Sequence, residues 1–87
     1  MTIDVTAAGK GRFKVTISED GQGRPYTVSL DDDYYRGLSR EDETKESFIR
    51  RSFGFLLARE SKDSILSSFD LRIISRYFPE YEEIIGK

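Results

Sequence analysis

The chain has 87 residues, of which 34% are charged, and its net charge is −2. This length is sufficient for one hydrophobic core, so we expect a single domain over residues 1–87. The sequence contains no cysteine and no histidine, which excludes disulfides, thiolate metal sites and most hydrolytic triads.

Both signs of charge are mixed along the chain, which is typical of a globular protein rather than a disordered tail or a basic nucleic-acid arm. The N-terminal residues Met1-Thr2-Ile3-Asp4-Val5 contain no basic segment followed by an apolar run. No apolar stretch approaches the ~20 residues that span a bilayer. We therefore expect a cytoplasmic location and no membrane association.

The first third of the chain predicts antiparallel strands. Residues 13–18 and 26–30 alternate apolar and polar side chains, as expected for strands with one buried face. Residues 19–25 are rich in glycine and other turn formers, which favours a β-hairpin. Ile3 and Val5 indicate a further strand within residues 2–7, so the choice between a hairpin and a three-stranded meander stays open.

Four helices are expected after residue 30. Apolar residues recur at helical spacing between residues 44 and 60, and Asp31, Thr44 and Asp70 carry oxygens that can cap helix starts. Pro79 ends a helix at the preceding residue, because that residue avoids the helical conformation. The expected helices lie near residues 32–38, 43–60, 70–78 and 79–85, with a connector at 60–64.

These elements predict an α+β fold in which the long helix covers the sheet. Its apolar arc supplies one side of the expected core, namely Phe48, Phe53, Leu56 and Leu57. The strands supply the facing side, namely Phe13, Val15, Ile17, Val28 and Leu30. The C-terminal helices are expected to close the core with Phe69, Ile73, Phe78 and Ile84.

Acidic residues cluster at 31–33, 41–43 and 80–83, at the predicted helix ends or on a helix face. We interpret them as capping and solubilising groups, because the spacing required for a calcium loop is missing. Gly9-Lys10-Gly11 and Gly21-Gln22-Gly23 do not complete a phosphate-binding fingerprint and are expected to be hairpin turns. We therefore expect no catalytic residues, no metal and no cofactor.

Two groups of residues are candidates for an interface. Tyr34 and Tyr35 are adjacent, so they diverge by about 100° on a helix and cannot both enter one core. Ser47, Gly54 and Ala58 form a stripe of small residues along the long helix. Ordinary packing within the chain is the favoured interpretation of both groups, and a binding surface or a dimer seam is the alternative.

Residues 26–60 resemble a ribbon-helix-helix DNA-binding unit. A strand is followed by Leu30-Asp31-Asp32-Asp33 at one helix start and by Thr44-Lys45-Glu46-Ser47-Phe48-Ile49-Arg50-Arg51 at a second. In that family, strands paired between two subunits enter the major groove, and the N-terminus of the second helix meets phosphate. The resemblance implies contacts to DNA from Thr27, Ser29, Thr44 and Lys45.

The whole chain is also similar to an uncharacterised family of small prokaryotic proteins. The similarity rests on the helix Ser52-Phe53-Gly54-Phe55-Leu56-Leu57-Ala58-Arg59-Glu60 and on a tail from Ser68-Phe69-Asp70-Leu71 to Tyr77-Phe78-Pro79-Glu80-Tyr81. It implies a family architecture and carries no activity with it.

The function is not readable from the sequence, and we expect a small non-enzymatic protein-interaction or accessory protein. Its partner would be an unidentified protein or a second copy of the chain. The alternative is a ribbon-helix-helix-like transcriptional regulator or antitoxin that binds DNA. Nucleic acid is the less expected partner, because the sequence pI of about 5.1 gives no overall attraction to phosphate.

Overall fold

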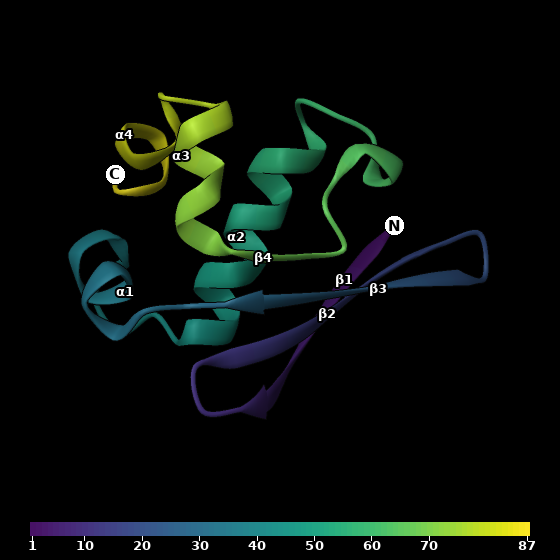
Figure 1. Cartoon of the computed structure of the whole chain (residues 1–87), viewed down its shortest axis with the longest axis horizontal. Coiled ribbons are helices and arrows are strands. Elements are labelled where there is room, and N and C mark those ends of the chain that lie inside the picture. Colours follow the sequence, from purple (N-terminus) through teal and green to yellow (C-terminus); the bar gives the residue numbers. More distant parts are fainter.

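A computed structural model describes all residues 1–87 and shows an α+β fold. The first half contains β1 (Thr2–Gly9), β2 (Arg12–Glu19), β3 (Gln22–Ser29) and α1 (Asp32–Leu38). The second half contains α2 (Lys45–Leu57), the 3-10 helix η1 (Lys62–Ser64), β4 (Ser68–Asp70), the 3-10 helix η2 (Leu71–Ile73), α3 (Ile74–Tyr77) and α4 (Tyr81–Ile85). Figure 1 shows α2 at the centre, with the strands on one side and α3 and α4 on the other.

The strands form one sheet in the order β1-β2-β3-β4. β1, β2 and β3 make an antiparallel meander, so the third strand expected within residues 2–7 is confirmed. The turn between β2 and β3 has positive φ at both Asp20 (54°) and Gly21 (80°), as in the two-residue turns that match the twist of a hairpin. β4 was not expected, and it adds to β3 in parallel, with Val28 opposite Phe69.

The helix starts follow the predicted caps. The Asp31 carboxylate accepts a hydrogen bond from the backbone N–H of Tyr34 at 3.1 Å, and α1 has the expected bounds. The Thr44 hydroxyl accepts from the backbone N–H of Ser47 at 3.1 Å. α2 is therefore shorter than the predicted 43–60: it begins after Thr44, whose backbone is extended (φ −74°, ψ 161°), and ends at Leu57, with Ala58 as the C-cap.

The helix predicted over residues 70–78 is wrong in its first part. Residues 68–70 are extended because the free edge of β3 binds them, with the N–H of Thr27 donating to the carbonyl of Ser67 at 2.9 Å. Asp70 then accepts from the N–H of Arg72 at the start of η2. The predicted stop before Pro79 is confirmed, since α3 ends at Tyr77.

The core lies between α2 and the inner face of the sheet. Phe53 of α2 joins the two, with its ring 5.6 Å from Tyr26 and 6.0 Å from Phe69. The prediction that the long helix covers the sheet is thereby confirmed. The buried apolar side chains include most of the predicted set and are completed by Tyr26, Ile49, Phe55, Ile65, Leu71, Ile74, Tyr81 and Ile85.

Some predicted core positions are wrong by one residue. Ile84 is 44% exposed while Ile85 is buried, and Ile74 is buried in place of Ile73, which is only half-buried. One residue of helix rotates a side chain by about 100°, and the short C-terminal helices contain too few apolar residues to fix that angle from the pattern. None of the helices is both long enough and apolar enough to cross a bilayer.

Candidate functional site

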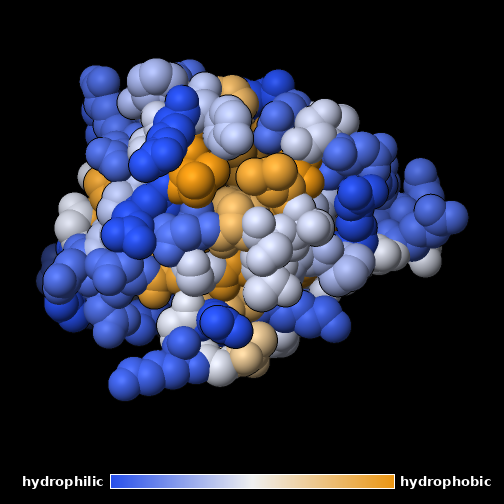
Figure 2. Space-filling model, in the orientation of Figure 1, coloured by the Kyte–Doolittle hydropathy of each residue, from blue (hydrophilic) through white to orange (hydrophobic).

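An apolar groove of about 320 Å³ lies between the C-terminal half of α2, the segment leading to β4, and the η2–α3 turn. Figure 2 shows apolar side chains gathered near the centre of this face, where Figure 1 draws α2 between α3 and that segment. We call this feature the apolar groove. Its lining residues are Leu56, Glu60, Ser64, Ile65, Leu66, Phe69, Ile73, Ile74, Tyr77 and Phe78.

Two of the large apolar side chains that line the apolar groove are unusually exposed to solvent. Leu66 is 50% exposed and Tyr77 is 68% exposed, and both line the groove. The chain has only two other large apolar residues with comparable exposure, Met1 and Ile84, and neither lines it. Single exposed apolar residues are ordinary on a protein surface, whereas apolar residues that gather at a hollow mark a contact site.

One wall of the apolar groove is fixed by contacts between η1 and the sheet. The Tyr26 hydroxyl donates to the carbonyl of Lys62 at 2.6 Å, and the Arg24 guanidinium pairs with Asp63 at 2.8 Å. Ile65 then enters the core, where only 4% of it is exposed. The segment carrying Leu66 is therefore held at a set position on the sheet.

The opposite wall is fixed by aromatic contacts. The Phe55 ring meets Phe78 and Tyr81 edge-on, at centroid distances of 5.8 and 5.2 Å. The Arg59 guanidinium lies 3.6 Å from the centroid of the Phe55 ring and pairs with Glu80 at 3.6 Å. These contacts hold α3 and α4 against α2, so the groove is a preformed gap between two anchored walls.

The polar content of the apolar groove is small. Ser64 and Glu60 are its only polar lining residues, and the Ser64 hydroxyl lies 3.3 Å from that of Ser61. Glu60 is half-buried and makes no ion pair within the chain. The groove thus offers an apolar surface with one uncompensated negative charge. Neither in the groove nor elsewhere in the chain do three or more acidic residues lie together in a group that could hold a metal ion.

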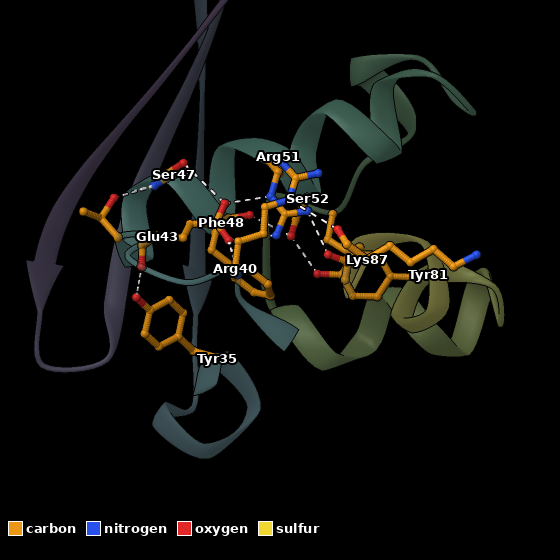
Figure 3. Close-up of polar contacts among 11 residues, drawn as sticks. Tyr35, Arg40, Glu43, Ser47, Phe48, Arg51, Ser52, Tyr81 and Lys87 are labelled. Atoms are coloured by element: carbon orange, nitrogen blue, oxygen red, sulfur yellow. Dashed lines mark hydrogen bonds and ion pairs between the residues drawn. The ribbon is translucent and has the colours of Figure 1, made fainter. Parts of the chain in front are cut away.

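Apart from the apolar groove, the structure contains a polar cluster around Glu43, which we call the Glu43 cluster and which is drawn in Figure 3. Nε and Nη2 of Arg51 each donate to the Glu43 carboxylate at 2.7 Å, and Nη1 of Arg51 donates to the carbonyl of Ile85 at 2.7 Å. The Arg40 backbone N–H also donates to Glu43. The hydrogen bond from Arg51 lowers the pKa of Glu43 to about 2, against the opposing effect of burial.

The Glu43 cluster ties four parts of the chain together. The Tyr35 hydroxyl of α1 donates to the carbonyl of Glu43, and the hydroxyls of Ser52 and Tyr81 lie 2.6 Å apart between α2 and α4. Burial raises the pKa of Tyr81 to about 12. Both oxygens of the Glu43 carboxylate are already bonded, so this arrangement fixes how the surrounding elements pack.

The predicted interface residues lie away from the apolar groove. Tyr34 and Tyr35 are both half-buried: the Tyr34 hydroxyl donates to Glu82 at 2.8 Å, and the Tyr35 ring packs edge-on against Phe48. Gly54 and Ala58 are exposed on α2, and Ser47 is half-buried beside Glu43. Leu56 faces the groove, about 200° around the helix from Gly54.

The residues implied as DNA contacts are divided between two faces. Thr27 and Ser29 point to the sheet face opposite α2 and line a hollow that Arg12 and Asp70 also line. Thr44 caps α2 and Lys45 pairs with Asp32. β3 has neighbours on both sides, so its pairing between two subunits would require β2 or β4 to leave it.

The sequence contained only part of the signal for the apolar groove. Phe69, Ile73 and Phe78 were expected in the core, and the structure places them on the groove wall. Leu66 belonged to no predicted element. An apolar residue outside any predicted helix or strand was the one sign in the sequence of an exposed apolar surface.

A scan against protein-family models and searches of curated proteins and of solved structures found no match for this chain.

Proposed function

We propose that this chain is a non-enzymatic protein-interaction domain whose apolar groove binds a short amphipathic segment of a partner protein. The segment would present two or three large apolar side chains beside a lysine or arginine. The observation that carries this proposal is the presence of exposed Leu66 and Tyr77 at one preformed hollow.

The size and lining of the apolar groove support a side-chain ligand. A volume of about 320 Å³ is near the lower end of the ~300–1,000 Å³ that small-molecule sites occupy. Such sites orient their ligands with several convergent polar groups, and only Glu60 and Ser64 are present here. A few apolar side chains, which need no oriented donors, match these properties better than a polar substrate.

Glu60 supports a basic residue in the bound segment. Its half-buried carboxylate has no cation beside it, whereas nearby Arg59 is already paired with Glu80 and stacked on Phe55. A lysine or arginine placed over Glu60 would gain a charge-assisted hydrogen bond at a site where water is partly excluded. Electrostatic complementarity of this kind sets specificity and register more than affinity.

The proposal can be tested by peptide display. Random peptides would be selected against the wild-type chain, with the Leu66→Glu variant used for counter-selection. We expect a consensus of two or three large apolar residues next to lysine or arginine. Amide chemical shifts should then change mainly for the groove-lining residues when a selected peptide is added.

Matched variants sharpen this test. Leu66→Glu should weaken peptide binding by about tenfold or more, since it places a charge on the apolar wall, and Glu60→Gln should weaken it by a smaller factor. Ile84→Glu is the control, because Ile84 is similarly exposed but lies outside the groove. Equal binding by all three variants, or shift changes confined to the outer sheet face, would contradict the proposal.

The DNA-binding alternative has a separate outcome. When a labelled DNA duplex is titrated with the chain, we expect no salt-sensitive binding, because the chain carries a net charge of −2. Salt-dependent binding that Lys45→Ala weakens would favour the regulator instead.

A further inference from the structure

β1 is an open edge of the sheet. It is eight residues long and has a strand neighbour only on the β2 side. Natural edge strands are protected by proline, lysine, β-bulges, shortness or covering elements. Thr2–Gly9 contains neither proline nor lysine, and its one irregularity lies at its end, between Ala7 and Gly9, so Thr2 to Ala7 pair regularly. The other edge, β4, is only three residues long and leads directly into η2.

The pairing pattern shows which groups of β1 face outward. The N–H of Leu30 donates to the carbonyl of Gly11, so odd-numbered residues of β2 bond to β3 and even-numbered ones bond to β1. In β1, this directs the backbone groups of Ile3, Val5 and Ala7 away from β2. The side chain of Arg50 agrees, since it donates to the carbonyl of Ile3 at 3.1 Å.

We propose that two copies of this chain pair through β1, antiparallel about a two-fold axis at Val5, to form one continuous sheet. In this register Val5 pairs with its own symmetry mate, and Ile3 pairs with Ala7 of the second copy. All three residues present the outward N–H and C=O groups that such pairs exchange. Arg50 can keep its bond, because a carbonyl oxygen accepts two hydrogen bonds.

The inner face of the pairing is apolar. Ile3 and Val5 pack against the core cluster but are only half-buried. In the proposed register they lie beside Ala7 and Val5 of the second copy, so each chain covers apolar surface that the other leaves open. The two cores thus continue into one another on the same side of the sheet.

The charges on the outer face also complement each other. Asp4 lies opposite Thr6 of the second copy, and Thr6 is the cross-strand neighbour of Lys14. Lys14 of one copy can therefore reach Asp4 of the other across one threonine, and the two Asp4 residues are offset rather than directly opposite. Neither Asp4 nor Lys14 has an ion-pair partner within the chain.

The β1 pairing leaves the apolar groove free. β1 and β4 are opposite edges of the sheet, and Phe69 of β4 lines the groove. A dimer through β1 would carry two grooves at its far ends, which increases avidity for a partner with repeated segments. The dimer and the proposed groove function rest on separate residues and can fail separately.

Sedimentation velocity over a concentration series tests the dimer with the full chain. We expect reversible dimerisation of the wild type and a dissociation constant raised about tenfold or more by Ala7→Pro. Proline is tolerated at this exposed position in the monomer, because the N–H that it removes faces outward. Ala7→Val keeps that N–H and is the matched control, so it should dimerise like the wild type.

Charge exchange gives a second measurement that does not depend on proline. Asp4→Lys and Lys14→Glu should each weaken the dimer, and the double variant should recover most of the wild-type dissociation constant. Circular dichroism and urea unfolding check that every variant folds. A wild type that stays monomeric, a dimer unchanged in both Ala7→Pro and Asp4→Lys, or a dimer lost only in Leu66→Glu would overturn the proposal.

Discussion

At the scale of single residues, Glu43 shows how a chain without disulfides fixes its loops. Its carboxylate has 6% side-chain exposure, and it joins Arg51 of α2 to the turn that begins at Arg40. Arg51 also reaches the carbonyl of Ile85 near the C-terminus. Removing one member of a partly buried ion pair leaves the charge of the other member uncompensated. The loss of folding stability is therefore larger than when one member of an exposed ion pair is removed.

Glu43→Gln should reduce stability in a pH-dependent way. The pKa of Glu43 is lowered to about 2 from 4.5, so the folded state binds fewer protons than the unfolded state between these values. The contribution, roughly 3 kcal/mol, is fully present above about pH 5 and is lost as the pH falls toward 2. Urea unfolding should therefore show a large difference between wild type and variant at neutral pH and convergence in acid.

Glu41→Gln is the matched control for that measurement. Glu41 is exposed in the same turn and makes no ion pair, so its substitution should leave the stability within about 0.5 kcal/mol of the wild type. A constant difference between Glu43→Gln and wild type at every pH would show that the ionic bond is not the source of the effect.

At the scale of elements, α2 has two faces with different roles. Phe48, Ile49 and Phe53 are fully buried against the sheet, while Gly54 and Ala58 lie exposed. The small-residue stripe suggested close packing within the chain. The structure leaves open space at Gly54, where an added Cβ would meet nothing within 4 Å.

Gly54→Ala should therefore stabilise the chain. Alanine is favoured over glycine inside a helix by about 0.8–1.0 kcal/mol, and the new methyl group would displace no neighbour. Thermal or urea unfolding measures the gain, which should appear as a shifted midpoint with an unchanged denaturant slope.

Gly21→Ala is the contrasting variant, because Gly21 has a φ of 80° in the turn between β2 and β3. It should lose stability, since a side chain is strained in that conformation. Destabilisation by Gly54→Ala would instead indicate that the stripe packs against something, and a second copy of the chain would be the first candidate to examine.

At the scale of the whole molecule, one aromatic residue joins the layers. Phe53 contacts Tyr26 on β3 and Phe69 on β4, and Phe69 in turn lines the apolar groove. A small domain has few such residues, and its net stability is only about 5–15 kcal/mol. The fold and the proposed binding surface therefore depend on the same contacts.

Phe53→Ala should cost about 3–5 kcal/mol, the usual cost of truncating a buried phenylalanine, and should also weaken peptide binding in the groove. Phe53→Leu keeps most of the volume and should cost less. Ile84→Ala is the control, since Ile84 is exposed and its truncation should stay within about 0.5 kcal/mol. If Phe53→Ala and Ile84→Ala reduced the stability by the same amount, this would contradict the claim that Phe53 joins α2 to the sheet.

The sequence by itself determined the elements whose signal is local. Alternation in residues 13–18 and 26–30, the caps at Asp31 and Thr44, and the stop before Pro79 each depend on neighbours in the chain, and all were confirmed. The α+β class followed from these elements and from the broad apolar arc of α2.

Only the tertiary structure decided what depends on distant residues. β4 exists because β3, whose paired residues lie 41 positions earlier in the chain, has a free edge, and three residues are too few to show a strand period. The apolar groove forms because η1 and α3 are anchored separately and leave a gap between them. Leu66 could not be assigned to a surface from its neighbours in sequence, since exposure is set by which elements pack and which do not.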